Sequence, residues 1–184
     1  AMFRQSIAAA AVGVLAAGVL ATGAAAASAD VKPQGKARGA TTVTLTDAAL
    51  GALGPLNPAN TKPGVLGADM GEVKASFPIV GNAKDGVIKH TGGLSLNDGT
   101  SYLTLKNYHI VVADGVLTAD AYLNDDYLAR IDLFDVALDG SAAPGCDASA
   151  DLTLNATAAG ALSAIFGVGD LTGAPIGDAC VDFR

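Results

Sequence analysis

The chain has no tryptophan, only two cysteines and two histidines, and 11 basic residues against 18 acidic ones, which gives a net charge of -7. We expect no nucleic-acid partner, because no basic patch is present to displace the counterions of a phosphate backbone. Neither cysteine has a second cysteine or a histidine at ligand spacing, so the sequence predicts no metal site of that kind.

Glutamate is nearly absent as well, since Glu72 is the single one among the acidic residues. Glutamate favours helices, whereas aspartate favours turns, where its carboxylate bonds to the nearby backbone. The acidity therefore indicates a turn-rich fold with a soluble surface and not an acidic binding face. Asp125 and the aspartates that follow it lack the ligand order of an EF-hand, and we interpret them as turn and strand-edge residues.

The first residues have the pattern of a secretory leader. Arg4 precedes an apolar run from Ile7 to Leu20, and Ala27-Ser28-Ala29 offers small residues at a cleavage site. This pattern predicts a signal peptide over residues 1–29, a secreted or cell-wall-associated protein, and no stable membrane insertion after the leader is removed. The alternative is a retained transmembrane anchor, since residues 6–29 carry no charge.

Residues 30–42 are polar, partly basic and without periodicity, which predicts a flexible linker. A tether to an anionic cell wall or membrane is the alternative for this segment. Residues 43–184 are then long enough for a single domain with a core of its own.

Asp-Gly pairs divide the centre of the chain into apolar runs of strand length. The pair is a strong hairpin signal, because aspartate bonds to its own backbone and glycine accepts a positive φ. The predicted strands form a β-meander, and they are Glu72 to Asn82, Val87 to Leu96, Tyr102 to Val112, Val116 to Leu123 and Leu128 to Leu138.

Two of these predicted strands change the face that carries their apolar residues. In the third, Leu103 and Leu105 share one parity while Tyr108 and Ile110 share the other, and the fifth changes in the same way after Leu133. A β-bulge shifts the parity in this manner. Two such changes predict a curved sheet, hence an antiparallel β-sandwich or partly closed barrel built on the meander.

A strand, short helix, loop and strand occur on both sides of the meander. The helices are predicted at Asp47 to Leu53, capped by Thr46 or Asp47, and at Ala156 to Phe166. The residues from Thr44 to Leu53 align with those from Thr153 to Leu162, which indicates an internal repeat.

Cys146 and Cys180 are the two cysteines of a chain that we expect in an oxidising compartment. One disulfide between them is the natural interpretation. Two free thiols are the alternative.

His90 and His109 both lie in predicted strands, and no Gly-x-Ser-x-Gly elbow is present. A hydrolytic triad would require the fold to bring distant residues together, so a secreted hydrolase is a weak alternative. The four tyrosines, all in the meander, join these histidines as candidate ligand-binding residues near the mouth of a pocket, and they are Tyr102, Tyr108, Tyr122 and Tyr127. Strand surface is the alternative for these rings.

Three segments resemble the HtaA-type haem-acquisition domain of secreted and wall-associated actinobacterial proteins. They are Gly71-Glu72-Val73-Lys74-Ala75-Ser76-Phe77, the glycine-rich segment Gly86 to Leu94 with His90, and Leu103-Thr104-Leu105. The resemblance covers roughly residues 41 to 184. It implies a β-rich extracellular module and haem binding through an axial tyrosine helped by a histidine. The tyrosine expected after Ser76-Phe77 is replaced here by Pro78-Ile79-Val80.

The sequence therefore predicts a secreted, mainly β domain with two short helices and one disulfide. We expect a surface or binding module without enzymatic activity or cofactor, whose partner is a cell-wall component, a surface protein or a small apolar ligand. Haem is the alternative ligand.

Overall fold

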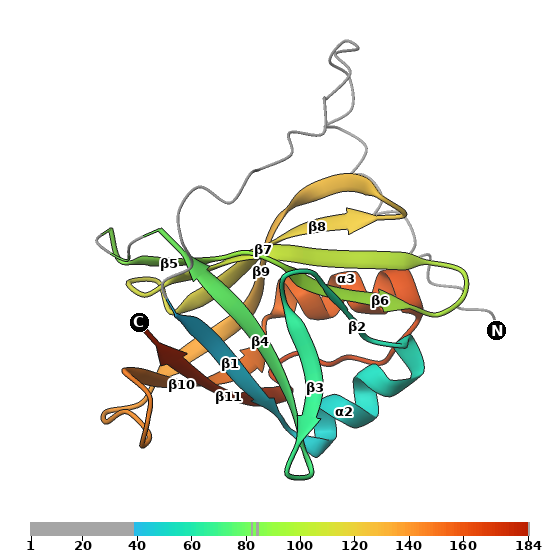
Figure 1. Cartoon of the computed structure of the whole chain (residues 1–184). Coiled ribbons are helices and arrows are strands. Elements are labelled where there is room, and N and C mark those ends of the chain that lie inside the picture. Colours follow the sequence, from blue (N-terminus) through green and yellow to red (C-terminus); the bar gives the residue numbers. More distant parts are fainter. Residues whose placement is uncertain (1–38, 82, 84, 184) are drawn as a thin grey trace, which may run out of the picture. The chain divides into compact units, whose positions relative to one another are not determined.

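Eight antiparallel strands close into a barrel, and β2, β3 and β6 extend its wall (Figure 1). The computed structural model describes residues 39–81, 83 and 85–183, all within the compact unit Pro33–Arg184. The predicted signal peptide, residues 1–29, lies outside the described residues. The elements are β1 (Ala40–Leu45), α2 (Asp47–Leu53), the 3-10 helix η1 (Gly54–Leu56), β2 (Ala59–Thr61), β3 (Val65–Asp69), β4 (Glu72–Val80), β5 (Val87–His90), β6 (Gly93–Asn97), β7 (Tyr102–Val111), β8 (Val116–Leu123), β9 (Asp126–Leu138), β10 (Ala148–Leu154), α3 (Ala156–Phe166) and β11 (Pro175–Asp182).

Around the barrel the strands follow the order β7, β5, β4, β1, β11, β10, β9, β8 and back to β7. The strands from β4 to β9 form the predicted meander. Gly86, Gly99 and Gly115 have φ of 69°, 91° and 62°, and Asn124 and Asp125 are also left-handed, so the turns lie where the sequence predicted them. The prediction of a mainly β barrel is confirmed, and the pairing of β7 with β8 closes the ring completely.

The predicted strand from Val87 to Leu96 is two strands. Gly92, with φ of 84°, separates β5 from β6, and both pair with β7. On its other side β5 pairs with β4, whereas β6 pairs with β2. The break occurs because the two halves have different neighbours.

Two boundaries in the first part of the chain also differ from the prediction. β1 begins at Ala40, so Ala40 to Thr42 belong to the barrel and not to the predicted linker of residues 30–42. They extend the strand because β4 and β11 bond to it from both sides. The predicted loop after η1 contains β2, which has only three residues, and β3, whose residues are mostly exposed, so neither shows an alternation of apolar and polar residues in the sequence.

The repeated unit places both helices at one end of the barrel. β1 and β10 are each antiparallel to β11, so they run in the same direction, and α2 and α3 follow their ends. Thr46 and Asn155, which occupy equivalent positions, cap the two helices by accepting from Ala49 N and Thr157 N. Three residues after each cap, at equivalent positions, Ala49 and Ala158 are both buried.

Bulges produce both changes of apolar face. The pairing of β7 with β8 shifts between Lys106 and His109, where Asn107 has φ of 56°. The pairing of β8 with β9 shifts between Leu117 and Thr118, which leaves Leu133 as the extra residue. Each strand therefore keeps apolar side chains inside on both sides of its bulge, as Leu105 and Tyr108 show in β7.

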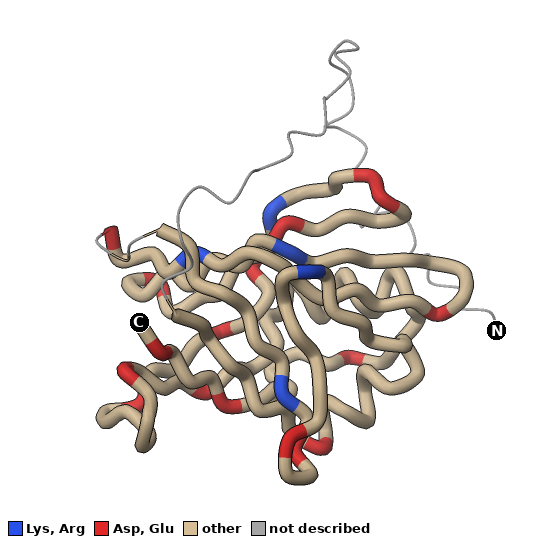
Figure 2. Tube along the Cα trace, in the orientation of Figure 1, with Lys and Arg blue, Asp and Glu red and all other residues tan. Residues whose placement is uncertain are grey.

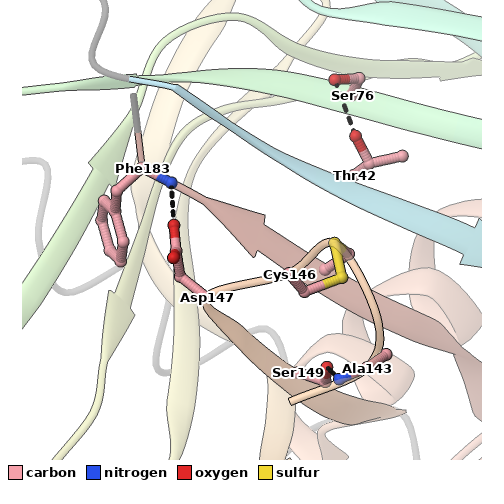
Figure 3. Close-up of a disulfide and its surroundings, with 8 residues drawn as sticks. Thr42, Ser76, Ala143, Cys146, Asp147, Ser149 and Phe183 are labelled. Carbon is pink, nitrogen blue, oxygen red and sulfur yellow. Dashed lines mark hydrogen bonds between the residues drawn. A yellow bond between two sulfur atoms is a disulfide. The ribbon is translucent and has the colours of Figure 1, made fainter.

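The predicted disulfide joins Cys146 to Cys180, with a Cα–Cα distance of 5.4 Å (Figure 3). It fixes the segment before β10 against β11, where Asp147 Oδ2 accepts from Phe183 N at 2.6 Å. Ser149 Oγ accepts from Ala143 N at 2.7 Å in the same segment.

Acidic residues gather at bends of the chain, as at the hairpin between β3 and β4 (Figure 2). There Asp69 and Glu72 lie 3.1 and 3.3 Å from Lys74 Nζ. In the turn before β7, Asp98 Oδ1 accepts from Ser101 N and Thr100 N, and these bonds lower the pKa of the Asp98 carboxyl. Aspartate shapes turns here, as its abundance predicted.

At Gly177 the backbones of β1 and β11 lie so close together that a side chain would not fit between them. A Cβ at this residue would overlap the carbonyl oxygen of Thr44, whereas a Cβ at Gly67 meets nothing. We expect Gly177→Ala to lower the free energy of unfolding by about 1 to 3 kcal/mol, measured by chemical denaturation. The control Gly67→Ala should change it by less than about 0.5 kcal/mol. Equal effects of the two substitutions would contradict this packing.

Candidate functional site

An apolar cavity of about 210 Å³ lies inside the barrel. Its wall is made of inward-facing side chains from strands all around the sheet, among them Val43, Phe77, Leu105, Leu133 and Leu152. These residues share the inner parity of their strands, which is why the pleat brings them together. The cavity is the space that they leave unfilled.

The two helices close one end of the cavity. Ala49, Ala52 and Leu53 of α2 and Leu162 of α3 reach its wall. The side chains that α2 presents are mostly alanines, so the helix covers the end of the barrel without filling it.

One polar group, formed by Thr41, His90 and the backbone of Tyr108, lies on the cavity wall. His90 is 3% exposed and Thr41 is 3% exposed. His90 Nε2 is 2.7 Å from Thr41 Oγ1, and His90 Nδ1 is 3.1 Å from Tyr108 O. A carbonyl oxygen only accepts, so Nδ1 carries the proton and Nε2 accepts from the Thr41 hydroxyl. The imidazole is neutral with both nitrogens bonded.

Burial lowers the pKa of His90 from 6.5 to about 4. Desolvation is the main cause, and the nearby His109 adds to it, whereas the bond to Tyr108 O opposes it. The ring therefore stays neutral at physiological pH.

Tyr108 contributes an aromatic wall beside His90. Its ring meets Phe77 edge to face with centroids 4.7 Å apart, and its hydroxyl donates to Leu105 O at 2.9 Å. Complete burial raises the pKa of the Tyr108 phenol, and a backbone bond from Leu94 opposes this rise only in part. Tyr108 is thus an uncharged, fully bonded ring.

The bulge at Asn107 decides that Tyr108 faces the interior. Arg130 holds this bulge from outside, since its guanidinium donates to Asn107 O at 2.6 Å and to Asp120 Oδ1 at 2.6 Å. Asn107 Nδ2 donates to Asp120 Oδ2 at 3.0 Å. These bonds fix the bulge that shifts the parity between Leu105 and Tyr108.

The other candidate residues lie on the outer surface and do not line the cavity. His109 faces outward beside Arg130, and burial, followed by the charges of Arg130 and Lys89, lowers its pKa to about 4. The three remaining rings lie at the β8–β9 end of the sheet: Tyr122 packs against Tyr127 at 5.3 Å and under Lys106 Nζ at 4.1 Å, and Tyr102 is 37% exposed. Of the six predicted residues, the fold brings His90 and Tyr108 to the cavity.

Thr41 was missed because it was assigned to the linker. The alternation of Thr41 with Val43 and Leu45 was the signal that could have placed it on the inner face of a strand. Phe77 and the helix alanines were not recognised either, because no local pattern marks a residue as lining a cavity.

Within residues 39–81, 83 and 85–183, no group of three or more histidine, cysteine, aspartate or glutamate side chains is arranged to hold a metal ion. None of the helices in this part of the chain has the length and apolar character needed to cross a membrane.

The buried His90 predicts a dependence of stability on pH. Its pKa is 6.5 when unfolded and about 4 when folded, so between these values the unfolded chain binds the proton more readily. We expect stability to fall as the pH falls from 6.5 to 4, by about 3 kcal/mol for this residue. Denaturation curves of His90→Gln should show a smaller loss in this window, and the comparison is made in a His109→Gln background, because the lowered pKa of His109 would add a loss over the same pH range. An unchanged slope in His90→Gln would contradict the prediction.

Solved structures that are similar to this chain include two from one bacterium. The haem-binding protein HtaB from Corynebacterium glutamicum matches with a TM-score of 0.56 at 12% identity, over 78% of this chain and 91% of that chain. The C-terminal domain of HtaA from the same organism matches with a TM-score of 0.48 at 17% identity, over 79% of this chain and 98% of that chain. No family model and no curated protein matches the chain. The resemblance predicted from the sequence is therefore confirmed at the level of the fold, which the chain shares with HtaB.

Proposed function

We propose that this protein is a binding module that holds a small apolar molecule inside the barrel. The observation that carries the proposal is the cavity of about 210 Å³ with its apolar wall. An engineered apolar cavity of about 150 Å³ in another protein stays dry and binds benzene, so a space of this kind has a real affinity for small apolar ligands.

The fold supports this function. HtaB, which has the same fold, is a haem-binding protein. A disulfide persists best in an oxidising compartment, and together with the predicted leader it supports a module that acts outside the cytoplasm. A cell-wall or surface-protein partner is part of the same proposal, as is the absence of a nucleic-acid partner.

A catalytic role for the Thr41–His90 pair is not part of the proposal. The hydroxyl and imidazole are 2.7 Å apart, as a nucleophile and base would be. However, the pKa of His90 is lowered to about 4, which makes the ring a weak base at neutral pH. His90 Nδ1 bonds to a backbone carbonyl and not to a carboxylate. We therefore propose binding without catalysis.

Haem is the second candidate because HtaB shares the fold. The residues inside this barrel do not fit haem. The cavity is below the range of about 300 to 1,000 Å³ of typical ligand pockets. Both His90 nitrogens and the Tyr108 hydroxyl are bonded, and no lysine or arginine is among the cavity residues to meet a propionate. The position after Ser76-Phe77 holds Pro78 and the buried Ile79, with no phenol to offer.

Filling the cavity tests the main proposal. Ala179 lines the cavity and is 3% exposed, so leucine at this position would occupy part of the space. We expect the wild type to bind toluene saturably in calorimetric or NMR titrations, and Ala179→Leu to bind it at least about 10-fold more weakly. The control Ala137→Leu places the same change on the exposed face of β9 and should leave affinity unchanged. Undiminished binding by a folded Ala179→Leu variant would contradict the location.

A hemin titration tests the second candidate. Because the cavity residues do not fit haem, we expect the Soret band of hemin to remain unshifted when the protein is added. The same titration with Tyr108→Phe and His90→Ala separates specific ligation from adsorption on the surface. A shift in the wild type that either substitution abolishes would establish haem binding and contradict the fit described above.

A further inference from the structure

The cavity wall contains no charged side chain. The residues around it are apolar apart from Thr41, His90 and Tyr108, and His90 is neutral. A carboxylate or ammonium group in this space would lose its hydration with no opposite charge to meet, which is strongly unfavourable. A ligand that fits the wall therefore carries no charge.

Every polar hydrogen of Thr41, His90 and the Tyr108 hydroxyl is already donated in a hydrogen bond within the protein. The proton on His90 Nδ1 is donated to Tyr108 O, because a carbonyl oxygen cannot donate. His90 Nε2 then has a lone pair toward Thr41, so the Thr41 hydroxyl hydrogen is donated to it at 2.7 Å. The Tyr108 hydroxyl donates to Leu105 O at 2.9 Å.

Toward a ligand in the cavity, these side chains can therefore only accept hydrogen bonds. A hydroxyl has two acceptor lone pairs in addition to its hydrogen, so Thr41 Oγ1 can receive one more hydrogen bond while it donates to His90. The Tyr108 oxygen is also bonded from the backbone at Leu94, which uses part of its own accepting capacity. Thr41 Oγ1 makes only the bond to His90, whereas the Tyr108 oxygen makes two, so Thr41 Oγ1 is the freer acceptor on the wall.

We propose that the ligand is an uncharged molecule with one hydrogen-bond donor, an alcohol or a phenol, whose hydroxyl donates to Thr41 Oγ1. This inference rests on the proposed function, since it requires that the cavity binds a ligand. Ethers, ketones and carboxylates have only acceptors, so they would face the Thr41 lone pairs without a hydrogen to share. The backbone and His90 together set this preference by fixing the direction of each bond.

Isomeric probes test the inference on the wild-type protein. Octan-1-ol and heptyl methyl ether have the same atoms and similar shape, but only the alcohol donates. We expect octan-1-ol to bind about 5- to 10-fold more tightly than the ether in calorimetric titrations. Octanoate at pH 8 should bind at least about 100-fold more weakly than the alcohol. Equal or tighter binding of the ether, or of octanoate, would overturn the inference.

A double substitution tests whether Thr41 and His90 cause the tighter binding of the alcohol than of the ether. Thr41→Val combined with His90→Leu removes both polar side chains while keeping similar volume, and both are changed because valine alone would leave His90 Nε2 as a new acceptor. The preference for octan-1-ol over the ether should vanish in this variant. A preference that persists would overturn the assignment to Thr41, and if the variant does not fold, the wild-type series decides.

The toluene titration distinguishes a failure of the proposed ligand class from a failure of the proposed binding function. Toluene binding with no preference for the alcohol overturns the ligand class and leaves the binding function standing. If neither toluene nor any of the three probes binds, the proposed function fails, and the inference fails with it.

Discussion

The closure of the sheet is the constraint on which the rest of the structure depends. β1 bonds to β4 on one side and to β11 on the other, and β7 bonds to β8, so the ring of strands has no gap. Most inward side chains are then surrounded by others and buried. The helices cover one end of the barrel, and the cavity is the volume that small residues such as Ala179 leave open.

A second constraint sets which residues face this enclosure. β7 runs along the barrel with Leu103 and Leu105 inside, and a regular strand would then point Tyr108 outward. The left-handed Asn107 inserts one residue and reverses the parity. Asp120 of β8, which pairs with β7, and Arg130 of β9, which lies beyond β8, hold that residue, so an outer ion pair controls the inner wall.

Burial of the polar group is tolerated because each of its members has a partner. A buried imidazole without bonds would be costly, but His90 bonds to both Thr41 and Tyr108, and no buried side-chain nitrogen or oxygen within the described residues lacks a partner. The barrel keeps the ring neutral. Because the neutral ring donates to Tyr108 O and accepts from Thr41 Oγ1, the otherwise apolar wall has one polar site, which can accept a hydrogen bond from a ligand.

Local chemistry was enough for the sequence to predict the turns, the two helices, the cap of the first helix and the bulge in β7, whereas the Cys146–Cys180 pair followed from the presence of two cysteines in a chain expected outside the cytoplasm. Aspartate, glycine and the capping residues act within a few positions, and a change of parity is visible along one strand. Only the tertiary structure decided that β1 starts at Ala40, that the sheet closes, and that His90 and Tyr108 meet Thr41 inside while the other candidate rings lie outside. These outcomes depend on which strands become neighbours, and hydrogen bonds between residues 49 positions apart, such as those of Thr41 and His90, leave no pattern in the local sequence.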